Sequence, residues 1–172
     1  MRKVFGTAVF LLLALPGVSF AATLSLSPAS GSYVVGERVT VKVIVSSTDK
    51  SINAVAGTLS FPYDILKVES VLKSGALLNF WPTEPTQSQA TGIITFEGVS
   101  LSGFQGSNGI AITAVFRATK AGSGDIVFKS GQVLANDGNG TDVTSSLSGA
   151  TITITEAPEP APAPAPTAAP VK

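Results

Sequence analysis

The chain has 172 residues, of which 11 are basic and 11 acidic, so its formal net charge at pH 7 is zero. A neutral chain without a basic cluster is not typical of proteins that bind nucleic acid or anionic membrane surfaces. The sequence contains no Cys and no His, which excludes disulfides, the usual zinc and copper ligand sets, and catalysis by a Ser-His-Asp or Cys-His system.

Residues 1–21 have the pattern of a secretory signal peptide. Two basic residues precede an apolar run from Val4 to Leu15, and Ser19 and Ala21 supply the small residues of a cleavage site after Ala21. The apolar run is too short to span a bilayer comfortably. We therefore expect export through a cleaved signal, a secreted or cell-surface location, and no membrane insertion of the mature chain.

Residues 22–155 are predicted to form one all-β domain. Short runs that alternate apolar and polar residues follow one another, separated by turn residues, and no helical period is evident. The predicted strands are residues 23–27, 38–46, 54–61, 65–72, 92–100, 109–119, 125–129, 132–135 and 150–155, with a turn-rich link over residues 27–37. Many short alternating strands of this kind indicate an antiparallel sandwich or barrel.

The alternation also predicts which side chains face the core. In residues 38–46, four valines share one face, and in residues 109–119, four apolar residues occupy alternate positions. These predicted core residues are Val39, Val41, Val43, Val45, Ile110, Ile112, Ala114 and Phe116.

Residues 156–172 differ in composition from the rest of the chain. This segment holds more than half of the 11 prolines, mostly alternating with alanine. Such a sequence favours the polyproline II conformation, which extends by about 3 Å per residue. We expect a semi-rigid linker or tail.

The carboxylates give little support for an enzyme. They are scattered along the chain, and no motif marks a pair of the kind that glycosidases require. Glu97 stands among apolar neighbours in the middle of a predicted strand, where a solvent-facing Glu is the simpler interpretation. We expect no catalytic residues and no cofactor.

Asp137, Asn139 and Asp142 form the most polar loop and are a weak candidate for a calcium site. An EF-hand loop beginning at Asp137 would require a Glu at its twelfth position, which is Ser148. Asn, Asp and Gly are also the usual residues of tight turns. We therefore expect no metal site. The segment from Asn139 to Thr141 fits the glycosylation sequon.

Trp81 is the single tryptophan of the chain. An exposed, flat ring could stack on a sugar, and Phe80 and other aromatic residues could extend such a platform. The alternative interpretation is that Trp81 fills the core or plugs a loop. An exposed Trp81 would favour a carbohydrate partner.

Five segments, in this order, resemble the cohesin family, whose members receive dockerin modules. They are "YVVGERVTVKVIVSS", "INAVAGTLSFPYDILKV", "GIITFEGVS", "GIAITAVFRATKAGSGDIVFKSGQVLANDGNGTDV" and "GATITI", and the similarity covers about residues 23–155. The resemblance implies a nine-stranded jelly-roll β-sandwich, related to a group of cellulose-binding modules. It also implies a non-catalytic role in which one sheet face receives the helices of a dockerin.

Strand parity together with the resemblance assigns a partner-binding face. Val55, Gly57, Leu59 and Phe61 form one set of side chains. The alternate set, which is smaller and more polar, is expected to face outward. In the later strand, Thr95 and Glu97 are expected to face outward, opposite Ile94 and Phe96. The predicted face comprises Ala54, Ala56, Thr58, Thr95 and Glu97.

The sequence departs from the family at this face. Well-known cohesins place polar Asn and Asp near the positions of Ala54 and Ala56, where they bond a dockerin helix. The corner reads Ser-Phe-Pro-Tyr-Asp over residues 60–64, where the family has Ser-Tyr-Asp-Pro. A flat face of Ala and Thr could still accept an apolar helix.

We therefore expect an exported, non-catalytic binding module that assembles or scaffolds proteins through a dockerin-like partner, with a link to polysaccharide degradation. Two alternatives remain open. One is a carbohydrate-binding module on the same jelly roll. The other is a cell-surface structural or adhesin domain, held away from the envelope by the Pro-rich tail.

Overall fold

The computed structural model describes residues 21–158. Residues 1–20 of the predicted signal peptide and residues 159–172 of the predicted tail therefore lie outside the described residues. Within residues 21–158 the chain forms nine strands and no helix, which confirms the all-β fold. No helix that could cross a membrane occurs in this part of the chain.

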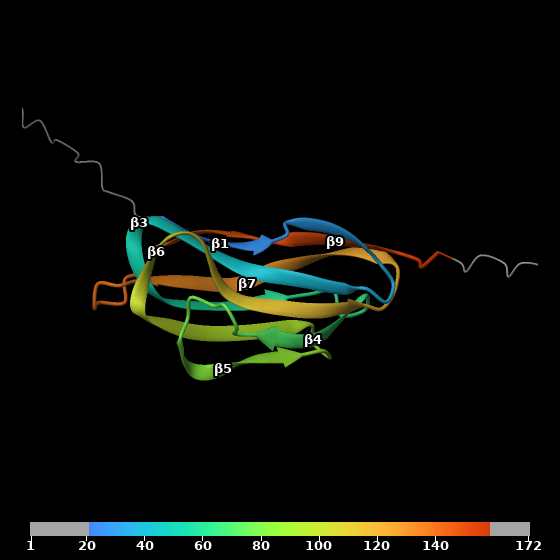
Figure 1. Ribbon diagram of the computed structural model, residues 1–172, viewed down its shortest axis with the longest axis horizontal. Helices are drawn as coiled ribbons and strands as arrows, with labels where there is room; N and C mark the ends of the chain where they lie inside the picture. The colour runs from blue at the N-terminus through green and yellow to red at the C-terminus, as the bar shows by residue number, and fades with distance from the viewer. Residues whose placement is uncertain (1–20, 159–172) are drawn as a thin grey trace, which may run out of the picture.

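The strands fold into a two-layered sandwich (Figure 1). They are β1 (Ala22–Ser27), β2 (Ser30–Val34), β3 (Arg38–Ser60), β4 (Leu66–Leu72), β5 (Phe80–Ser88), β6 (Ile93–Ala118), β7 (Gly122–Ala135), β8 (Thr144–Ser148) and β9 (Ala150–Thr155). β3 and β6 are long enough to contribute to both layers.

We call the layers sheet I and sheet II. Sheet I has the order β8, β1, first half of β3, second half of β6, β4, and sheet II has the order β7, second half of β3, first half of β6, β5. Both long strands change layer where their pairing register shifts, between Ser47 and Ile52 in β3 and between Phe104 and Gly106 in β6. β9 pairs with β2 and with the beginning of β7.

Three strands replace six of the predicted ones, because β7 also joins the predicted strands 125–129 and 132–135. Residues 38–46 and 54–61 were predicted separately, and so were residues 92–100 and 109–119, yet each pair is continuous in the structure. Pairing is antiparallel except between β1 and β8 and between β2 and β9, which are parallel. Three observed strands were not predicted. β2 contains Ser and Gly, β8 consists mostly of Ser and Thr, and β5 contains two prolines. β5 pairs only with β6, and such an edge strand tolerates proline.

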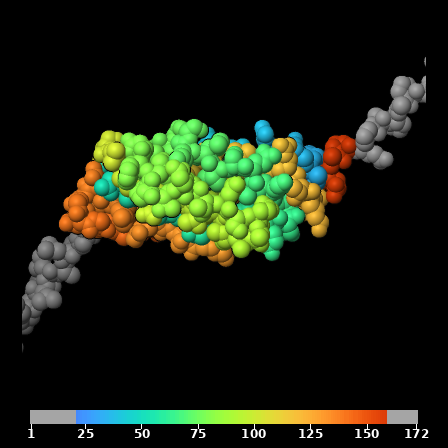
Figure 2. All heavy atoms as spheres, turned by 90° about the horizontal axis from the view of Figure 1, so that it is seen from below, coloured from blue at the N-terminus to red at the C-terminus, as the bar shows by residue number. Residues whose placement is uncertain are grey.

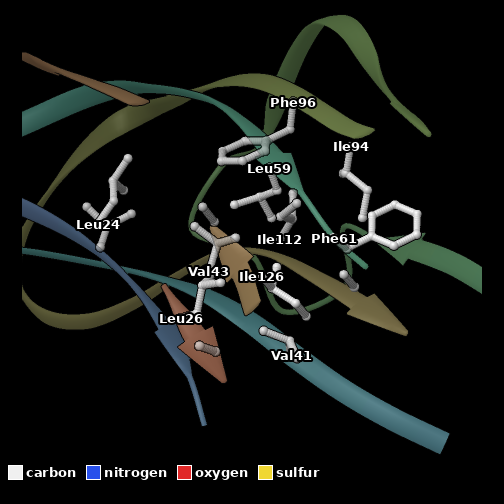
Figure 3. Close-up of a cluster of buried hydrophobic side chains, with 14 of the residues drawn as sticks. Leu24, Leu26, Val41, Val43, Leu59, Phe61, Ile94, Phe96, Ile112 and Ile126 are labelled. Carbon is white, nitrogen blue, oxygen red and sulfur yellow. The ribbon is translucent and has the colours of Figure 1, made fainter. Parts of the chain in front are cut away.

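The core fills the space between the sheets (Figure 3). The four valines in the first half of β3 are at most 1% exposed, as their alternation predicts. From sheet II, Leu59 and Phe96 point toward Ile112 and Val43 of sheet I. The rings of Phe61 and Phe116 lie 5.1 Å apart, at an angle of 57°.

The prediction that Ile110 shares the buried face of Ile112 is wrong. Val43 pairs with Ile112, whereas the next residue of β3, Ile44, pairs with Ile110. Ala111 is therefore an extra residue in β6, and it is fully buried while Ile110 is only half-buried. A β-bulge of this kind reverses the alternation on one side of itself.

The corner after β3 connects the two sheets. Pro62 O accepts hydrogen bonds from the backbone N–H groups of Ile65, at 3.2 Å, and Leu66, at 2.9 Å. Gln89, which follows β5, then fastens this corner. Its amide donates to Tyr63 O and Leu66 O, and its carbonyl accepts from Val68 N. One side chain thus ties the β5–β6 loop of sheet II to β4 of sheet I.

Candidate functional site

The outer face of sheet II carries the predicted binding residues. Ala54, Ala56 and Thr58 are half-buried and alternate with fully buried neighbours, and Thr95 and Glu97 are exposed. Gly57 belongs to the inward-facing set of this strand. A Cβ there would lie 2.7 Å from the ring of Phe96, so the ring can fill the space directly beneath the sheet. The five residues are therefore brought together as the parity predicts, and their binding role stays a prediction.

Direct pairing aligns side chains in four rungs across β7, β3, β6 and β5. The rungs are Leu134–Ala54–Val99–Phe80, Gln132–Ala56–Glu97–Thr83, Ser130–Thr58–Thr95–Thr86 and Val127–Ser60–Ile93–Ser88. Residues that pair directly point to the same side of a sheet. The face therefore begins with an apolar rung, continues with two polar rungs, and ends with a mixed one. Glu97 is the only charged residue in the four rungs.

The two middle rungs form a shallow hollow of about 360 Å³. It is lined by Ala56, Gly57, Thr58, Thr95, Phe96, Glu97, Ser130, Gly131, Gln132 and Asp142. A smaller hollow of about 80 Å³ lies between β5 and the same part of β6. Figure 2 shows the side of the domain covered by β4, β5 and neighbouring segments, in green, with the orange segment that follows β7 at one end.

Asp142 lies at the rim of the hollow and accepts hydrogen bonds from two neighbouring residues. Its Oδ1 accepts hydrogen bonds from the N–H of Thr144, at 2.9 Å, and from the Thr144 hydroxyl, at 2.6 Å, and its Oδ2 accepts from Gln132 Nε2 at 3.3 Å. The Thr144 hydroxyl is the main cause that lowers the pKa of Asp142. These bonds fix the hairpin beside β7.

The other residues of the calcium candidate lie in the exposed loop after β7. Asp137 Oδ1 accepts a hydrogen bond from Asn139 N at 2.9 Å, and the pKa of Asp137 is lowered chiefly by a hydrogen bond from the Thr141 side chain. This is the turn geometry that Asp and Asn favour. Residues 21–158 contain no group of three or more Asp, Glu, His or Cys side chains arranged for a metal ion.

Trp81 is half-buried and packs against the core. A Cβ at Gly98 would lie 3.0 Å from both the Trp81 ring and Leu78, so these side chains close over that glycine. Lys73 Nζ lies 5.6 Å from the ring centroid and 2.5 Å from Glu84 Oε2. The indole is therefore packed against the core on one side and contacted by Lys73 on another. These contacts leave little of the ring free to stack on a sugar.

Phe80, Leu101 and Gln132 belong to this face and were not predicted as part of it, although Phe80 was considered as an extension of a sugar platform at Trp81. Phe80 is 51% exposed and Leu101 is 72% exposed. The place of Phe80 on this face was missed because β5 itself was not predicted. Leu101 could have been found, because it continues the outward parity of Thr95 and Glu97. Gln132 required the register between β7 and β3.

Solved structures identify the architecture. No family model matches the sequence, and no curated protein matches it. CaCohA2 from Clostridium acetobutylicum is similar with a TM-score of 0.66 and 18% identity, covering 80% of this chain and 92% of that chain. A chain of the type I cohesin–dockerin complex Coh-OlpA-Doc918 from Clostridium thermocellum gives a TM-score of 0.65 and 18% identity, over 78% and 99% of the two chains.

A further match comes from outside the bacteria. The non-cellulosomal cohesin from the hyperthermophilic archaeon Archaeoglobus fulgidus has a TM-score of 0.63 and 22% identity, covering 78% of this chain and 91% of that chain. A type II cohesin from Acetivibrio cellulolyticus is similar at a TM-score of 0.57. These similarities, at low sequence identity, concern the fold. The chain therefore has the jelly-roll fold of cohesin domains.

Proposed function

We propose that this protein is a non-catalytic module that binds a helical, dockerin-like protein partner on the outer face of sheet II. The observation that carries the proposal is the face itself. It spans four strands, presents small uncharged side chains at its centre, and has a single charged residue in its rungs. Such a face can be covered with little loss of charge solvation, as the centres of protein interfaces usually are.

The fold supports the same proposal. Similar solved structures include a cohesin–dockerin complex. The partner of this chain need not be a conventional dockerin, because alanines occupy positions 54 and 56 and offer no hydrogen-bonding side chain. Affinity would rest on shape and on a few anchors. The predicted signal peptide supports export, and the non-cellulosomal archaeal cohesin is a similar structure from outside a cellulosome.

Thr58→Arg is the direct test, since Thr58 lies in a middle rung between Ser130 and Thr95. We would measure binding to dockerin-like modules encoded in the same genome by calorimetry. Thr153→Arg is the matched control, because it places the same side chain on the exposed side of β9. We expect Thr58→Arg to weaken binding by at least about 30-fold, which corresponds to loss of a hot spot, and the control to bind normally. Equal binding by both variants would refute the face.

A further inference from the structure

One end of the binding face carries an outward-facing apolar cluster, in which Phe80 and Leu101 are exposed and the other members are half-buried. Its members are Ala54, Phe80, Val99, Leu101 and Leu134, drawn from β3, β5, β6 and β7. Phe80 and Leu101 are among the most exposed large apolar side chains of residues 21–158. Single exposed apolar residues are ordinary, but a contiguous group on a sheet face marks an interaction site.

Hydrogen bonds hold this apolar end in a fixed shape. Asn79 N donates to Val99 O at 3.0 Å, and Asn79 Oδ1 accepts from Leu101 N at 3.0 Å. The buried hydroxyl of Ser100 donates to Gly103 O at 3.2 Å, which fixes the turn that follows. The backbones that present Phe80 and Leu101 are therefore positioned before a partner arrives, which lowers the entropic cost of binding.

A carboxylate stands one rung away from this cluster. Glu97 is exposed, and no cation pairs with it in residues 21–158. It lies two residues along β6 from Val99, a distance of about 7 Å in a strand. Two residues four apart on a helix are separated by about 6 Å along its axis. A helix lying along β6 can therefore place one side chain on the apolar end and the next turn over Glu97.

We propose that the face selects a helix that carries a large apolar residue and a Lys or Arg three or four positions apart. This inference rests on the proposed function and specifies the chemistry of its partner. The apolar residue packs between Phe80 and Leu101, and the cation pairs with Glu97. A carboxylate is the natural acceptor for either cation.

Selection from a library tests the proposal without a known partner. A yeast-displayed helical hairpin with randomised outward positions would be selected first against the protein and separately against Glu97→Lys. We expect the first pool to be enriched in an apolar and a basic residue at the stated spacing. The second pool should replace the basic residue with Asp or Glu.

Matched variants then define the contacts of the selected clones. Glu97→Lys and Leu101→Ser should each weaken binding at least tenfold. Glu156→Lys makes the same charge change at an exposed site beyond β9, and Leu72→Ser removes an apolar residue that is 41% exposed on sheet I. Both controls should bind normally.

The outcomes separate this inference from the proposed function. Clones that lose binding with Thr58→Arg but bind Glu97→Lys and Leu101→Ser normally would overturn the inference and leave the proposed function standing. Clones whose affinity is the same for Thr58→Arg as for the wild-type protein would overturn both. A selection in which no clone binds more tightly than the unmodified hairpin would also overturn both.

Discussion

The outer faces of sheet I and sheet II are built by the same two long strands, yet they differ in charge. On sheet I, Arg38, Arg117 and Lys67 pair directly across β3, β6 and β4. Glu69 lies beside this rung and accepts from Arg38 Nε at 2.9 Å and pairs with Arg117 Nη2 at 2.6 Å. In the four rungs of sheet II, Glu97 is the only charged residue.

The difference in charge favours sheet II over sheet I as the face that a partner would cover. Sheet I has the wider hollow, about 660 Å³, but it is lined by the ion-paired residues. Covering those charges would remove them from water at a large cost. The small, uncharged side chains of sheet II carry no such penalty. Size alone would therefore favour the hollow on sheet I, whereas charge favours the hollow on sheet II.

The largest expected effect comes from the core beneath both faces. Phe116→Ala removes a fully buried ring and should lower the free energy of unfolding by about 3–5 kcal/mol. Urea unfolding followed by tryptophan fluorescence and by circular dichroism measures this loss. The neighbouring Val115→Ala, on the half-buried outer side of sheet I, should cost far less. Two separate transitions in Phe116→Ala would show that the sheets do not share one core.

Gln89→Ala should have the next largest effect, because its side chain links the sheets. The substitution leaves Val68 N and two carbonyl groups of the corner without their amide partner, at a cost of about 1–3 kcal/mol. Chemical denaturation measures the change. Gln87→Ala, at an exposed position of β5, is the control. Equal stability of the two variants would contradict the role of Gln89.

Glu69→Gln tests the charged rung of sheet I through pH. The Arg117 hydrogen bond is the main cause that holds the pKa of Glu69 below its ordinary value of 4.5, with Arg38 adding to it. A lowered pKa in the folded state stabilises the protein above the unfolded pKa, and this contribution is lost as pH falls through the folded value. The wild-type protein should therefore have the higher melting temperature at neutral pH, and the gap should close in acid.

Glu156→Gln serves as the control for that series, because Glu156 is exposed and follows the last strand. Its melting temperature should follow the wild-type curve throughout. A gap between wild type and Glu69→Gln that persists in acid would show that packing, rather than ionisation, accounts for the contribution of Glu69. Neither substitution should change binding on sheet II.

The smallest effect is expected at the centre of the binding face. Ala56→Asn adds a polar side chain to a position that points outward, so the free energy of unfolding should stay within about 0.5 kcal/mol of wild type. Thermal unfolding measures it. A loss of more than about 1 kcal/mol would mean that Ala56 packs into the structure rather than facing a partner.

Strict alternation made much of the fold and of the face predictable. The valines of β3 and the pair Thr95 and Glu97 have the orientation that period-two alternation requires. The bulge at Ala111 could not be seen, because an inserted residue leaves no mark in a run of Ile and Ala. The prolines of β5 concealed an edge strand, and with it Phe80. Gln132 joins the face through pairing across the sheet, which a single sequence does not specify.

Methyl NMR of the protein, with and without a selected helical binder, tests the central claim most directly. The methyl groups of Ala54, Ala56, Val99, Leu101 and Leu134 report on sheet II, and those of Leu72 and Val115 report on sheet I. We expect the binder to shift the sheet II signals and to leave Leu72 and Val115 unchanged. Shifts confined to Leu72 and Val115 would place the partner on the charged face and contradict the account.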